Sequence, residues 1–130
     1  MDQQQKNKEF IINYLNAMGG VSKTRALMEK YITDEALISH KEFFEAAFPC
    51  YEVYIDEMTA EGNRVILQAR LKGTHLGDFA GIPPTHKTVD FPFVIRYEIE
   101  DNKIVSHWML ADQMALMEQL GVVPAAEAVH

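Results

Sequence analysis

In residues 103–121, KIVSHWMLADQMALMEQLG, the spacing of apolar residues changes from that of a strand to that of a helix. The rest of the chain is organised around this stretch. Residues 104–111 are rich in branched and aromatic side chains and predict a strand, in which regular alternation places Trp108 and Asp112 on the same face. Apolar residues then recur at helical spacing up to Gly121, which stands where a left-handed cap ends a helix. We therefore predict a strand that runs into a short C-terminal helix at Asp112.

His107 is the residue before Trp108 and invites pairing with Asp112. Regular alternation points His107 to the opposite face of the sheet, where it would lie outside and could contact a dimer partner. A β-bulge would reverse this facing. The predicted catalytic residues therefore do not include His107.

Three helical segments are predicted in the first half of the chain. Apolar residues recur at spacings of three and four in residues 10–18, and Gly19 ends this first helix. Ser22 is a candidate cap for a second, short helix through about residue 30, and residues 33–38 predict a further turn or short helix. Ser39 and Glu42 fit a capping box that starts the third helix.

The capping box gives His40 a defined environment. It places His40 at the first helical position, where the positive end of the helix dipole disfavours an imidazolium ion. We therefore expect His40 to be neutral near pH 7 and to face a ligand pocket inside the domain.

Four strands follow the helices, because period-two alternation begins at residue 51 and returns in residues 65–72, 87–100 and 104–111. The connections are short, so the strands are predicted to be antiparallel. Pro92 lies inside the third of them and suggests an edge position or a bulge. The predicted fold class is α+β, with a curved antiparallel sheet wrapped around the N-terminal helices.

Composition favours one domain over residues 1–130, because 130 residues with 48% apolar and 24% charged side chains suffice for a single core. We expect the core to span about residues 8–121 and residues 122–130 to form a flexible tail. The net charge of −7 and the absence of a Lys/Arg run argue against nucleic acid and anionic membranes as partners. No signal peptide or membrane segment is apparent, so a cytoplasmic location is expected.

Two ordered motifs carry a family resemblance: GTHLGDFAGIPPTHK at residues 73–87, and the 103–121 stretch with its KIV, Trp108-x-x-x-Asp112 and QLG. They resemble the SnoaL-like polyketide (ester) cyclases of the nuclear-transport-factor-like superfamily. Weaker landmarks are His40, the Ala-Phe-Pro of residues 47–49 and residues 61–65, so the resemblance covers about residues 8–121. It implies a cone-shaped α+β domain of the cystatin-like type, open at one end.

The resemblance also implies a reaction without cofactor or metal, an intramolecular aldol condensation of a polyketide ester driven by an acid/base carboxylate. By this resemblance the catalytic residues are Asp112, His40 and His75. Beside Trp108, desolvation would raise the pKa of Asp112 toward the range useful for removing a proton from the carbon next to a carbonyl. The alternatives are that Asp112 only caps the last helix and that His75 only ties its loop to the sheet.

We expect the ligand to be a small apolar or aromatic metabolite. The predicted substrate-binding residues are Trp108, Tyr14, Met18, Phe79, Gln68 and Arg70. Gln68 stands where many relatives carry an arginine, and Arg70 on the same face could replace it. A metal site is not predicted, because the spacing of the nearby His and Asp residues matches no familiar site.

Two other functions remain open: a non-catalytic small-molecule binding protein, and an epoxide or ester hydrolase that would need Asp112 together with Arg70 to hold a water. We also predict a homodimer through the sheet, because the sheet has more apolar face than three short helices can cover.

Overall fold

The computed structural model describes residues 2–122. Its elements follow one another as the predicted α+β pattern of helices, strands and a terminal helix. They are α1 Gln3–Met18, α2 Arg25–Glu29, α3 Glu35–Ala47, β1 Glu52–Glu61, β2 Arg64–Thr74, β3 Thr88–Glu100, β4 Lys103–Ala111 and α4 Gln113–Leu120.

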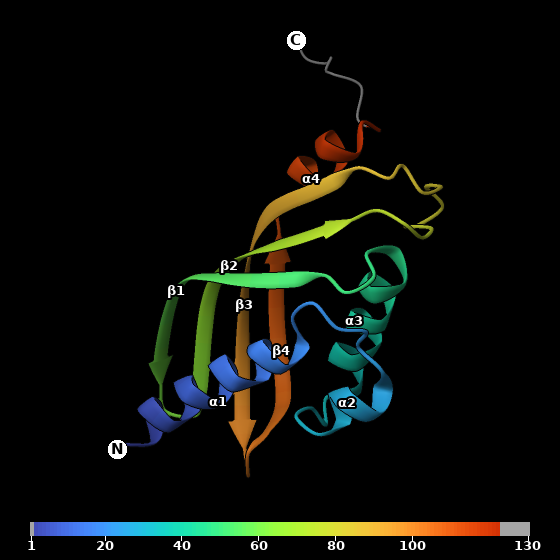
Figure 1. The fold of residues 1–130 in the computed structure, drawn as a ribbon. Coiled ribbons are helices and arrows are strands. Elements are labelled where there is room, and N and C mark those ends of the chain that lie inside the picture. The colour runs from blue at the N-terminus through green and yellow to red at the C-terminus, as the bar shows by residue number, and fades with distance from the viewer. Residues whose placement is uncertain (1, 123–130) are drawn as a thin grey trace.

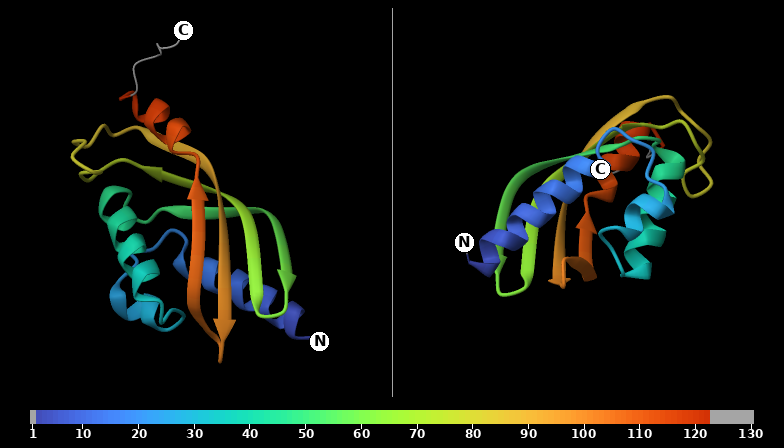
Figure 2. Two further views of the ribbon diagram at one scale, coloured as in Figure 1. Left: turned by 180° about the vertical axis from the view of Figure 1, so that it is seen from behind. Right: turned by 60° about the horizontal axis from the view of Figure 1, so that its bottom comes forward.

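The four strands form one antiparallel sheet in the order β1-β2-β3-β4. The sheet is strongly bent, and α1, α2 and α3 lie on its concave side, whereas α4 packs beside the N-terminal end of β3 (Figure 1). The two other views show the same cone-like wrapping (Figure 2). The curved sheet around N-terminal helices was therefore correctly predicted.

The concave face of the sheet forms the core together with α1 and α3. Along β2 and β3 every second side chain is buried, for example Leu67 and Tyr97. α1 adds Tyr14 and Met18, which are 0% and 2% exposed. Burial of these side chains holds the helices on the sheet, because removing apolar surface from water makes the main favourable contribution to the free energy of folding.

The predicted starts of the second and third helices are wrong. α2 is capped by Thr24, whose Oγ1 accepts a hydrogen bond from Leu27 N, rather than by Ser22. α3 begins five residues before the predicted capping box, because Asp34 caps it through bonds from the amides of Ala36 and Leu37. His40 consequently lies in the middle of α3, away from the positive end of the dipole.

A β-bulge in β4 overturns the predicted facing of this strand. Glu98 pairs with Ser106 and Ile99 pairs with Ile104, so Val105 is an extra residue with no partner. Alternation restarts after the bulge. His107 therefore joins the concave face opposite Tyr97, while Trp108 turns outward opposite Arg96 and is 49% exposed.

Pro92 is in an interior strand, and no bulge interrupts the pairing around it with β2. Its carbonyl accepts a hydrogen bond from Asp112 N, the residue at which β4 has ended. The position where Pro92 lacks an N–H therefore faces β4 just past its last paired residue. No hydrogen bond between β3 and β4 is lost there. Among the helices of residues 2–122, none is long and apolar enough to cross a membrane.

Candidate functional site

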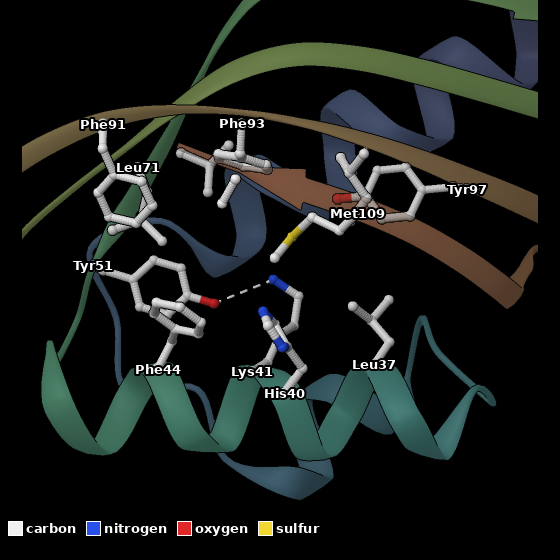
Figure 3. A pocket seen from close by; sticks show the side chains of 13 residues that line it. Leu37, His40, Lys41, Phe44, Tyr51, Leu71, Phe91, Phe93, Tyr97 and Met109 are labelled. Atoms are coloured by element: carbon white, nitrogen blue, oxygen red, sulfur yellow. Dashed lines mark hydrogen bonds between the residues drawn. The ribbon is translucent and has the colours of Figure 1, made fainter. Parts of the chain in front are cut away.

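Two neighbouring residues of α3, His40 and Lys41, reach from the helix toward the concave face of the sheet (Figure 3). They line a cavity of about 30 Å³ whose walls are mainly aromatic and aliphatic. The other polar groups of the wall are the hydroxyls of Tyr51 and Tyr97. A space of this size holds about one water molecule or a small functional group.

A wider groove of about 720 Å³ adjoins this cavity. It lies between α3, β4, α4 and the loop that carries Phe79. Groove and cavity share five wall residues, which are His40, Phe44, Phe91, Met109 and Ala111. A ligand in the groove could therefore extend one end into the cavity, and the groove volume is typical of small-molecule sites.

His107 lies in the groove wall and is held by Asp34. Its Nδ1 is 2.7 Å from Oδ2 of Asp34, and both side chains are largely buried. A carboxylate only accepts hydrogen bonds, so Nδ1 must carry the hydrogen and Nε2 remains available for a ligand. The other oxygen of Asp34 caps α3, which fixes the carboxylate in place.

His40 lines the groove and the cavity and carries an unsatisfied nitrogen. Its Nε2 is buried and has no hydrogen-bond partner in residues 2–122. Burial, followed by the positive charges of His107 and Lys41, lowers the pKa of His40. The expected neutral imidazole is thus favoured by desolvation rather than by a helix end.

Lys41 is the most deeply buried cation of the site, with 6% of its surface exposed. Its Nζ is 3.3 Å from the hydroxyl of Tyr51 (Figure 3). Burial, followed by repulsion from Lys23, lowers the pKa of Lys41 to about 7. Burial also raises the pKa of Tyr51, so this hydroxyl stays protonated.

The structure places several predicted site residues outside this cavity. Asp112 is exposed, its Oδ1 caps α4 by accepting from Ala115 N, and it borders a hollow on the outer sheet face. Gln68 lines the same hollow. Trp108 and Asp112 do share a face of the sheet, as predicted, but it is the outer face. Their predicted facing toward the cavity is wrong, because the bulge turns both outward.

Arg70 also lies on the outer face, where it pairs with Asp56 at 3.1 Å and Asp90 at 3.6 Å. The partnership of Arg70 with Asp112 that hydrolysis would need is not formed. In residues 2–122, no three metal-ligating side chains gather at one point.

His75 is completely buried but lines neither the groove nor the cavity. Its Nδ1 accepts a hydrogen bond from Thr85 N at 3.1 Å and lies 3.0 Å from the Thr85 hydroxyl. Its ring packs on Phe48 at 5.4 Å between centroids. The structure thus supports the alternative in which His75 ties its loop to the sheet.

The three remaining predicted substrate-binding residues lie at different places in the structure. Phe79 lines the groove. Tyr14 is buried beneath the cavity, 5.2 Å from the Nζ of Lys41 to its ring centre, and Met18 is buried in the core.

Sequence reasoning missed Asp34 and Lys41. It set His107 aside because of regular alternation, and the bulge named as the alternative is what brings His107 to the groove. A signal existed for Lys41, because it follows Leu37 and precedes Phe44 at helical spacing and so occupies an apolar position of α3. Asp34 could have been recognised as a helix cap, but its contact with His107 bridges 73 residues. No local pattern reports such a contact.

N-terminal helices, a curved four-stranded antiparallel sheet and a short C-terminal helix define a cone-shaped α+β domain. The model of the family described as "SnoaL-like polyketide cyclase" matches residues 22–120. The chain therefore belongs to the SnoaL-like polyketide cyclase family, as its motifs predicted.

Solved structures show the same fold at low sequence identity. AclR from Streptomyces galilaeus, a candidate hydroxylase, is 22% identical with a TM-score of 0.80, over 94% of this chain and 85% of its own. A candidate SnoaL-like polyketide cyclase from Jannaschia sp. CCS1 is 24% identical with a TM-score of 0.78, covering 95% and 99%. A SnoaL-like polyketide cyclase from Agrobacterium tumefaciens is 17% identical with a TM-score of 0.72, covering 88% and 98%. No curated protein matches the chain.

Proposed function

We propose that this protein catalyses a cofactor-independent acid/base reaction on a small apolar carbonyl compound, of the ring-closing aldol type after which its family is named. The observation that carries the proposal is the pair of imidazoles in one apolar groove, His40 with a free Nε2 and His107 bound to Asp34. The walls suit an apolar or aromatic metabolite.

The two histidines suit opposite roles. His40 is the base, because its lowered pKa leaves it neutral and able to accept a proton from the carbon next to a carbonyl. We assign His107 the role of the acid, because the Asp34 carboxylate 2.7 Å from its Nδ1 holds the ring in the groove wall, where Nε2 can carry and donate a proton. The carbanion attacks a second carbonyl of the same molecule, and the oxygen of that carbonyl takes the proton of His107. Proton return from His40 to His107 through solvent in the groove restores the site.

The first step of the test is to identify a ligand that remains bound through purification, by mass spectrometry. Turnover of that compound is then measured in His40→Gln and His107→Gln, which keep a polar side chain of similar size but cannot carry out acid/base catalysis. We expect each change to lower kcat by about 10²-fold or more while binding is retained.

His86→Gln is the matched control, because His86 is exposed on the loop and lines neither groove nor cavity. Parent-like turnover in both groove variants would contradict the proposal. A parent protein that binds its ligand and never converts it would instead be the non-catalytic binding protein.

A further inference from the structure

Lys41 is a buried amine that the acid/base scheme does not use. It points from α3 into the closed end of the cavity, where its Nζ meets the Tyr51 hydroxyl at 3.3 Å (Figure 3). The aromatic rings of Tyr14 and Tyr51 lie 5.2 Å and 5.6 Å from Nζ. A lysine is almost never fully buried unless its charge is paired. The question is therefore which groups, if any, balance the charge of Lys41.

A second buried lysine provides the comparison. The Nζ of Lys23 donates to Val21 O, to Tyr51 O and to the Glu45 carboxylate, at 3.2 Å, 2.7 Å and 3.3 Å. Lys41 has only the Tyr51 hydroxyl as a hydrogen-bond partner in residues 2–122. Burial lowers the pKa of Lys23 as well, but the Glu45 carboxylate opposes that shift, whereas an ammonium at Lys41 would have no carboxylate bound to it.

The neutral form of Lys41 fits this environment. A free amine needs only the Tyr51 hydroxyl, which can donate to its lone pair. Because burial lowers the pKa of Lys41 to about 7, the free amine is well populated near neutral pH, unlike that of an exposed lysine. A free amine on a lysine in an apolar cavity is the usual nucleophile toward carbonyl carbon.

We propose that Lys41 forms a Schiff base with an aldehyde or ketone group that enters the closed end of the cavity from the groove. The amine nitrogen bonds to the carbonyl carbon, the carbonyl oxygen leaves as water with the two amine hydrogens, and a C=N bond remains. The inference rests on the proposed function for its carbonyl ligand. It adds a reason for the neighbouring His40, since protonation of this imine makes the adjacent C–H easier to remove.

Reductive trapping tests the inference without any need for turnover. The protein is treated with propanal and sodium cyanoborohydride at about pH 7, and propylated lysines are located by peptide mass mapping. We expect Lys41 to be modified at least about tenfold faster than the exposed lysines, which are almost fully protonated at this pH. We expect labelling of Lys41 to rise with pH to half its maximum near pH 7.

Lys23 is the matched control within the same chain, because it is equally buried and also contacts Tyr51 but is paired with Glu45. Labelling of Lys41 no faster than that of Lys23, in protein shown to be folded by circular dichroism, would overturn the inference. Such a result leaves the acid/base function standing, which the turnover of the His40 and His107 variants decides separately.

In the Lys41→Met variant, the fast labelling should disappear while the exposed lysines react as before. Persistent fast labelling would assign the reactive amine to another lysine and would also overturn the inference.

Discussion

At the scale of single residues, the burial of Lys41 should make the stability of the protein depend on pH. The folded-state pKa of about 7 lies below the ordinary value of 10.5. Between these two pH values the unfolded chain binds more protons than the folded one, so the free energy of unfolding must rise with pH across this window. We expect a gain on the order of 4 kcal/mol between about pH 6 and about pH 10.

Lys41→Met should remove this part of the pH dependence, and it should be more stable than the parent at about pH 6, where the parent must bury a charge. Urea denaturation at several pH values measures both effects. Lys23→Met should behave in the opposite way and destabilise, because it leaves Glu45 without its partner. A parent whose stability does not change relative to Lys41→Met from pH 6 to pH 10 would contradict the prediction.

At the scale of elements, Asp112 caps α4, and this structural role can be tested separately from the catalytic role that was predicted for it. Its Oδ1 accepts from Ala115 N at 2.9 Å, and asparagine can make the same bond. We expect Asp112→Asn to unfold like the parent and Asp112→Ala to lose about 1 kcal/mol, as measured by denaturant unfolding.

The same variant tests the catalytic role that was predicted for Asp112. Because the carboxylate is exposed and borders the outer face, we expect Asp112→Asn to keep its turnover of the identified ligand. A folded Asp112→Asn variant that has lost turnover would contradict the assignment of the reaction to His40 and His107.

The sequence was sufficient to predict these elements but not all of their boundaries and facings. Period-two and period-3.6 patterns reflect burial, and burial determines where strands and helices lie. Asp34 and Ser39 are both good caps by residue type, and the choice between them depends on packing of the first turn of α3. The bulge at Val105 likewise depends on strand pairing with Glu98 and Ile99, so alternation alone assigned His107 to the wrong face.

At the scale of the whole molecule, the outer face of the sheet presents an apolar cluster to solvent. It consists of Ile66, Val94, Trp108 and Leu110, which are 44%, 37%, 49% and 63% exposed. These residues lie on three adjacent strands, where Ile66 and Trp108 flank Arg96 and Val94 is opposite Leu110. Exposed apolar side chains gathered on one sheet face are typical of an interface, and the homodimer through the sheet stays a prediction.

We expect Trp108→Glu to convert a dimer to a monomer, because each copy would place a carboxylate into the apolar contact. Light scattering at micromolar concentration measures the mass of parent and variant. Ile12→Glu is the control, because Ile12 is 40% exposed on α1 and is outside the cluster. A monomeric parent would rule out the dimer, and a dimeric Trp108→Glu would place the interface elsewhere.

Asp34 has a consequence for how this chain can evolve. At an ordinary helix start, Ser, Thr, Asn and Asp replace one another readily, because each can cap. Here one oxygen caps α3 and the other holds His107. Among these residues only aspartate provides both contacts together with a negative charge, so we expect replacement at position 34 to be restricted both by the helix cap and by the proposed role of His107. A lineage that abandons the chemistry should be recognisable by a neutral cap at position 34 in an otherwise unchanged helix.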